Sequence, residues 1–198
     1  MGWRIRRPRS TLTFSLAQLS PKAYLEGLGE NLAPLSNYLT NPSPETEKPA
    51  RAMLNVATTK FQYTHCSRHP ERISPESWIY DQYFLDRIGN DEIQLALFRD
   101  YKTNPPLYAA WQAYLRAYQP PTLVGWVRND PFFTEAGARA YLRDVPGVEQ
   151  HLLDTGHFAL GNHAGEIAAH IRAFVKLPIL FVSEPPTFTL FALCATYE

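Results

Sequence analysis

The chain has 198 residues, a length typical of one domain. Its 19 Lys and Arg residues balance 19 Asp and Glu residues, so the formal net charge is zero and no basic surface favours nucleic acid as a partner. Hydrophobic residues make up 45% of the chain, which is enough to build a core, yet no segment is long and apolar enough to suggest a membrane span.

Helical patterns fill residues 21–119, after an N-terminal segment, 1–20, in which residues 11–16 suit a strand. The first pattern is a series of leucines at helical spacing: Leu25, Leu28, Leu32, Leu35 and Leu39. Ser43-Pro44-Glu45 is a helix start with proline in the first turn, but Pro49 is expected to delay the helix itself to 50–63. Further helices are predicted over 74–87, 90–101 and 107–118.

The pattern then changes to strand, helix, strand, helix over 122–127, 134–144, 149–154 and 163–175. This order predicts parallel strands joined by a right-handed crossover, and therefore the α/β class for residues 120–176. Residues 177–198 form an atypical apolar tail, in which 178–182 and 188–193 suit either two edge strands or an appendage with no place in the fold. Two strands are too few for a stable sheet, so the chain reads like the latter part of a larger α/β domain.

The two cysteines, Cys66 and Cys194, form no Cys-x-x-Cys pair. The simpler interpretation is a reduced protein in the cytoplasm, with one disulfide left open. A mitochondrial import signal is the alternative, because four arginines precede the first acidic residue: Arg4, Arg6, Arg7 and Arg9. Pro8 argues against it, since proline would break the amphipathic helix that such a signal needs.

An acid and a histidine follow the two predicted strands. Asp130 comes after 122–127, and His157 comes after 149–154. The carboxyl ends of parallel strands meet at one edge of a sheet, so this placement brings the two side chains together. Asp130 would then fix the tautomer of His157, whose other nitrogen would activate water or a nucleophile. The alternative is an Asp-Pro turn beside an ordinary loop histidine.

No residue of the chain stands out as the nucleophile. A hydrolase nucleophile needs a small-residue frame such as Gly-x-Ser-x-Gly, because the turn leaves no room for side chains, and no serine occupies such a frame. Cys66 lies beside His65 without flanking glycines, and adjacent side chains seldom point at each other.

Other groups of residues favour structural roles. The histidines at 151, 157, 163 and 170 match no usual ligand spacing, so we expect no metal and no other cofactor. Gly27-Leu28-Gly29 follows no strand and lacks the glycine that opens a phosphate-binding helix. Most aromatic residues of the helical part are expected to pack helices, although one or two could line a pocket: Tyr63, Tyr80, Tyr83, Tyr101, Tyr108, Tyr114, Trp78 and Trp111.

Around Pro121–Phe133 and Leu153–Leu160 the sequence resembles the α/β-hydrolase superfamily, and most closely its epoxide hydrolase and haloalkane dehalogenase branch. The resemblance spans about Ala23 to Val175. It implies that 21–119 is a helical cap, that Asp130 is the catalytic acid and that His157 is the catalytic histidine. It also implies hydrolysis of a small apolar organic substrate (an epoxide, an alkyl halide or an ester), with cap tyrosines holding the leaving oxygen of an epoxide.

The departures from that family lie at both ends. Gly2-Trp3-Arg4-Ile5 looks like the helix just after the nucleophile turn, and the oxyanion loop and the first core strands have no counterpart. The resemblance therefore predicts a truncated hydrolase without activity of its own. The alternative is a non-catalytic interaction module or a mis-spliced product, whose exposed sheet edge would favour self-association.

Overall fold

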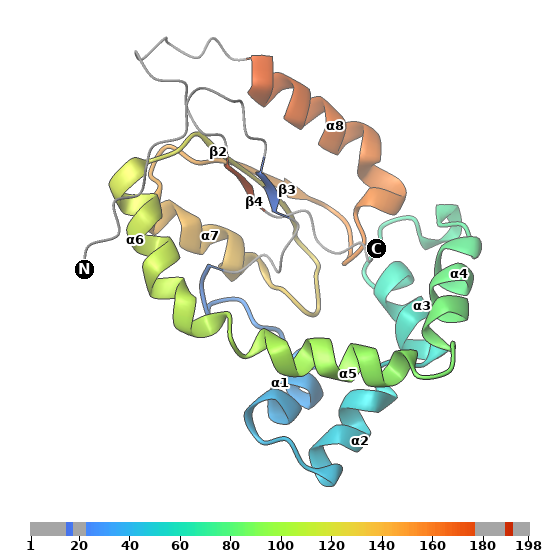
Figure 1. Cartoon of the computed structure of the whole chain (residues 1–198). Helices are drawn as coiled ribbons and strands as arrows, with labels where there is room; N and C mark the ends of the chain where they lie inside the picture. Colours follow the sequence, from blue (N-terminus) through green and yellow to red (C-terminus); the bar gives the residue numbers. More distant parts are fainter. Residues whose placement is uncertain (1–14, 18–22, 177–188, 192–198) are drawn as a thin grey trace.

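The computed structural model describes residues 15–17, 23–176 and 189–191, and it combines a parallel sheet with helices (Figure 1). The strands of this part are β1 Ser15–Ala17, β2 Thr122–Val127, β3 Glu149–Leu153 and β4 Thr189–Phe191. Its α-helices are α1 Ala33–Thr40, α2 Pro44–Ala52, α3 Val56–Thr64, α4 Glu76–Leu85, α5 Asn90–Tyr101, α6 Tyr108–Tyr118, α7 Glu135–Asp144 and α8 Leu160–Lys176.

The sheet has the order β1-β4-β2-β3, and all its strand pairs are parallel. β2 and β3 pair from Leu123 opposite Glu149 to Val127 opposite Leu153, as expected for a strand-helix-strand unit. The tail differs from both interpretations of its sequence. β4 lies between β1 and β2 rather than at an edge, because its backbone pairs with both neighbours, whereas residues 178–182 lie outside the described part.

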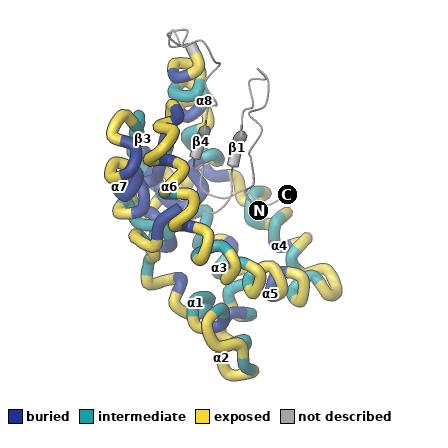
Figure 2. The backbone as a smooth tube through the Cα atoms, turned by 60° about the vertical axis from the view of Figure 1, so that its left-hand side comes forward, coloured by how far each residue is buried: buried dark blue, intermediate teal, exposed yellow. Residues whose placement is uncertain are grey.

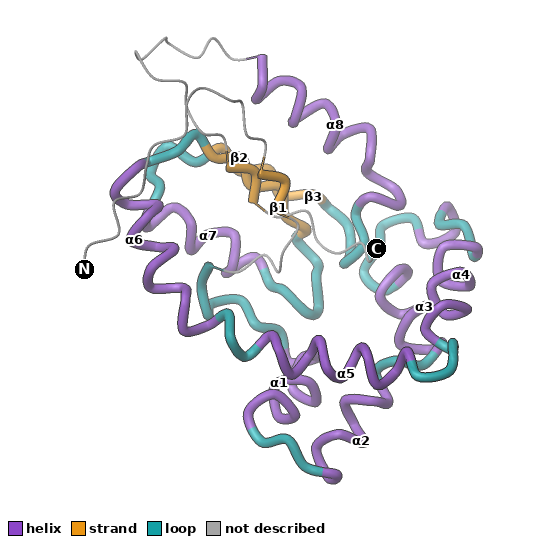
Figure 3. The backbone as a smooth tube through the Cα atoms, in the orientation of Figure 1, coloured by secondary structure: helices purple, strands orange, loops and turns teal. Residues whose placement is uncertain are grey.

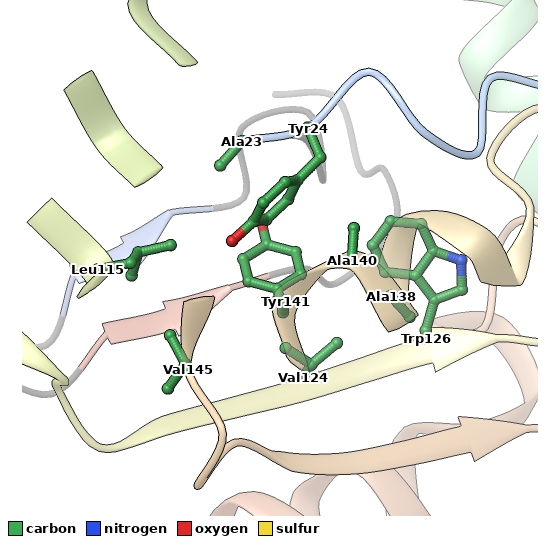
Figure 4. Close-up of a cluster of buried hydrophobic side chains, with 9 residues drawn as sticks. All are labelled: Ala23, Tyr24, Leu115, Val124, Trp126, Ala138, Ala140, Tyr141 and Val145. Atoms are coloured by element: carbon green, nitrogen blue, oxygen red, sulfur yellow. The ribbon is translucent and has the colours of Figure 1, made fainter. Parts of the chain in front are cut away.

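Helices cover the two faces of the sheet: α7 lies on one face and α8 on the other (Figure 1). On the α7 side, Val124 and Trp126 of β2 belong to one buried cluster with Tyr141, whose ring lies edge-on to Tyr24 at 4.8 Å (Figure 4). On the α8 side, Ile167 packs against Leu153 and Val127. Alternate apolar side chains of β2 therefore pack into two separate cores, one on each face of the sheet.

α1 to α6 form a helical block beside the sheet (Figure 1). The expected delay at Pro49 is wrong: α2 already begins at Pro44, where Ser43 and Thr46 form a reciprocal capping box. Pro49 lies inside α2 and removes only one backbone donor there. The helix ends at Ala52 instead, and Asn55 caps α3 by accepting a hydrogen bond from Thr58 N at 3.0 Å.

The first part of the predicted leucine helix is also wrong, because residues 23–29 form a non-helical arm of bends and a turn. Gly27 has φ +80°, a left-handed conformation that ends helices. Leu25 and Leu28 are exposed, whereas Tyr24 of the same arm is fully buried. The arm binds the loop after β2, and this tertiary contact outweighs the helical spacing of the leucines.

Burial is uneven across the molecule (Figure 2). β2 and α7 are rich in buried residues, whereas α4, α5 and the turn between them expose large apolar side chains such as Tyr83, Ile88 and Leu97. Among the described residues, no helix has the length and apolarity to cross a membrane.

Candidate active site

The loops after β2 and β3 leave the sheet at the end that faces α3 and α4 (Figure 3). Backbone pairing continues beyond the strands: Arg128 N donates to Leu153 O at 2.9 Å, and Asn129 N donates to Thr155 O at 3.2 Å. Each loop therefore starts in a fixed register with the other. This places Asp130 and His157 opposite one another.

The structure brings these two side chains into contact: His157 Nδ1 lies 2.9 Å from Asp130 Oδ2. The side chain of His157 is 6% exposed and that of Asp130 is fully buried, so bulk water hardly competes for this bond. A carboxylate can only accept, so the proton lies on Nδ1. Nε2 is then the nitrogen that can take a proton, which is the tautomer a catalytic base needs.

The backbone fixes the second oxygen of Asp130. Its Oδ1 accepts hydrogen bonds from Phe132 N at 2.7 Å and from Phe133 N at 3.1 Å, as in an Asx-turn. The turn holds the carboxylate in one orientation before any substrate arrives. An Asp-Pro turn and a contact between Asp130 and His157 are alternative predictions, and the structure contains both: Asp130 forms the turn and also faces the histidine.

Aromatic rings surround the imidazole. The ring centroids of Phe132, Phe158 and Phe133 lie 4.9, 4.8 and 5.9 Å from that of His157. These rings restrict water and lower the local polarity, which strengthens charge interactions inside the site. These phenylalanines adjoin the two motifs in the sequence, but nothing in their local pattern indicates that they surround the histidine.

The arm of residues 23–29 supports the acid loop from outside. Gly29 N donates to Phe132 O at 2.8 Å, and Thr134 N donates to Gly27 O at 2.9 Å. A Cβ on Gly29 would lie 2.2 Å from Pro131 O, so the close approach requires glycine. Gly27-Leu28-Gly29 is thus a packing element. A close backbone approach of this kind depends on residues more than 100 positions away, which local sequence reasoning does not address.

The tyrosines take different positions. Tyr63 is the one whose ring packs against Phe158, at 4.3 Å, but its hydroxyl donates to Asp81. Burial, followed by that neighbouring carboxylate, raises the pKa of Tyr63. Tyr80 and Tyr83 are exposed, and the hydroxyls of Tyr101 and Tyr108 meet each other at 3.0 Å.

The side chains of the remaining candidates have other surroundings. The ring of His65 stacks on Phe61 at 4.1 Å, and Cys66 is exposed. The rings of His151 and His170 stack at 3.6 Å on the surface. Within the described part of the chain, no group of three or more His, Cys, Asp or Glu residues is placed to hold a metal ion.

Known proteins resemble this chain over part of their length. An uncharacterized hydrolase of Saccharomyces cerevisiae, YNR064C, is 33% identical over 182 residues, which are 86% of this chain and 60% of the yeast protein. The crystal structure of Cfl2 from Burkholderia cenocepacia matches 78% of this chain and 52% of its own, with 16% identity and a TM-score of 0.51. The yeast relative carries the description of a hydrolase, and the likeness to Cfl2 concerns the fold alone.

Two further comparisons give no additional information on the family. Est816, described as an N-acyl homoserine lactone degrading enzyme, matches 75% of this chain and 54% of its own with 19% identity, and its TM-score of 0.43 is too low to carry an argument. No family model matches the chain. The chain thus spans about 60% of the yeast relative's length and about half of each solved structure.

Proposed function

We propose that this chain supplies the His-Asp pair of a hydrolase that acts on small apolar epoxides, alkyl halides or esters. The observation that carries the proposal is the buried contact of 2.9 Å between His157 Nδ1 and Asp130 Oδ2. The 33% identity to a yeast hydrolase and the resemblance to the epoxide hydrolase and haloalkane dehalogenase branch support it.

In this mechanism a carboxylate nucleophile attacks a carbon of the substrate, which expels halide or opens the epoxide ring and leaves an ester on the protein. His157 Nε2 then takes a proton from water, and the resulting hydroxide attacks the carbonyl carbon of that ester. Asp130 stabilises the imidazolium that forms. The alcohol leaves with the proton from His157, and the carboxylic acid that remains gives its proton to water, which regenerates the carboxylate nucleophile. The alkoxide that forms when an epoxide opens takes its proton from water. With a serine nucleophile the same pair would hydrolyse esters.

We further propose that the 198 residues alone do not turn over such substrates. No serine lies in a Gly-x-Ser-x-Gly frame, and the pair cannot form a covalent intermediate by itself. The assay offers the purified chain a chromogenic ester, an aryl epoxide and a bromoalkane. Turnover above buffer that disappears in His157→Ala would contradict the inactivity and support the role of the pair.

The role of the pair is tested in a chimera, in which this chain replaces the matching part of the yeast relative. We expect His157→Ala to abolish the hydrolysis that the chimera performs, and Asp130→Asn to slow it by about 10⁴-fold because the amide favours the wrong tautomer. A hydrolysing chimera that keeps full activity in both variants would refute the proposed function.

A further inference from the structure

A loop of the helical block lies directly against the loop that carries His157. This block loop, residues 65–68, joins α3 to the segment before α4. A Cβ on Gly156 would lie 2.2 Å from His65 O and 3.2 Å from Ser67 N. The two backbones therefore touch one residue before the histidine.

Asn162, in the first turn of α8, joins the two loops with its side chain. Its Nδ2 donates to Ser67 Oγ at 2.8 Å and lies 3.0 Å from Thr155 Oγ1, with Thr155 itself 1% exposed. Its amide therefore connects the block loop to a buried residue two positions before His157.

A second set of polar contacts lies at the start of the His157 loop. Asp154 Oδ1 accepts from Asn129 Nδ2 at 3.0 Å, while its Oδ2 pairs with Arg68. Asn129 precedes the catalytic acid and Arg68 belongs to the block loop. The acid loop, the His157 loop and the helical block therefore share one carboxylate. The Arg68 pair is well exposed, so we expect it to matter less than the Asn162 contacts.

We propose that the block loop is a positioning element for His157, and that Ser67 and Asn162 are the residues through which it acts. The inference rests on the proposed function, because it concerns the same histidine. The helical block then does more than cover the site: while it is docked, it holds the imidazole in register with Asp130. A shift of the block, for example on substrate entry, would loosen the histidine through the same contacts.

The experiment follows the Nδ1 proton of His157 by NMR in the full chain with ¹⁵N-labelled histidine. A proton held between imidazole and carboxylate resonates downfield of the amides and exchanges slowly with water. We expect Asn162→Ala to speed its exchange by about tenfold, the factor for losing one hydrogen bond, and Ser67→Ala to give a smaller change in the same direction. Asn37→Ala and Ser74→Ala are the matched controls, because both residues are exposed and lie elsewhere on the block.

The outcomes separate the positioning role from the proposed function. Unchanged exchange in both Asn162→Ala and Ser67→Ala would overturn the positioning role, as would equal changes in the two controls. A wild-type chain without this proton signal would show that the pair itself is not formed, which refutes the proposed function first. If Asn162→Ala no longer melts cooperatively, Ser67→Ala decides alone, since it removes a single hydroxyl.

Discussion

Replacing Gly29 by alanine tests whether the arm holds the acid loop. Gly29 has φ −77° and ψ 155°, an extended conformation that alanine adopts without strain. The substitution therefore adds only a methyl group, 2.2 Å from Pro131 O and 3.0 Å from Phe132 O. Ordinary contacts begin near 3.4 Å, so the two segments must separate by about 1.2 Å, the difference between 3.4 and 2.2 Å.

We expect this separation to cost about 1–3 kcal/mol of unfolding free energy, as overpacking does elsewhere. For a chain of this size that lowers the melting temperature by about 2–4 °C per kcal/mol. The Nδ1 proton of His157 should also exchange faster, because Pro131 directly follows Asp130. Gly165→Ala in α8 is the control, since nothing lies within 4 Å of its added methyl. It should stabilise the chain by about 0.5–1 kcal/mol. If Gly29→Ala is as stable as the wild type and leaves the proton unchanged, the arm does not support the acid loop.

Two further predictions concern buried polar contacts. Burial raises the pKa of Asp144, but the hydrogen bond from Arg116, at 2.7 Å, acts together with the neighbouring Tyr24 and Arg143, and their combined effect lowers the pKa of this carboxyl. The pair therefore stabilises the fold above about pH 4 and loses this effect as acid protonates Asp144. At pH 7, Arg116→Ala should lower the free energy of unfolding by about 1 kcal/mol. If the difference between variant and wild type is as large at pH 3 as at pH 7, the prediction is wrong. In the second, Thr59→Val removes the hydroxyl that donates to Gln82 Oε1 at 2.8 Å between α3 and α4. Urea unfolding should show a loss of about 1–3 kcal/mol, and equal midpoints would show that the buried amide finds another partner.

The bounds of β2 can be predicted from the local sequence, because the apolar pattern and the flanking turn residues indicate the same strand. Residues 122–127 are an apolar run bounded by prolines and by the Asn129-Asp130-Pro131 turn, and β2 has the predicted bounds. The contact between Asp130 and His157 then follows from strand order alone. Its catalytic role stays a prediction.

The parts that sequence reasoning missed depend on residues far apart in the chain. β4 is three residues long, and its central place comes from pairing with β1 and β2. The arm looked helical because Leu25 and Leu28 repeat at a helical interval, although both are exposed. Asn162 carries no motif, and its role appears only when the 65–68 loop lies beside it. The local sequence pattern predicts individual helices and strands, whereas contacts between distant residues can be recognised only in the folded structure.

The contact between Asp130 and His157 depends on fewer elements than the sheet as a whole. β2 and β3 are adjacent, and the backbone bonds from Arg128 N and Asn129 N extend their register as far as Thr155. The Asx-turn then fixes Asp130 within its own loop. None of these contacts involves β1 or β4, so the pair can be assembled by residues 122–158 and their immediate cover.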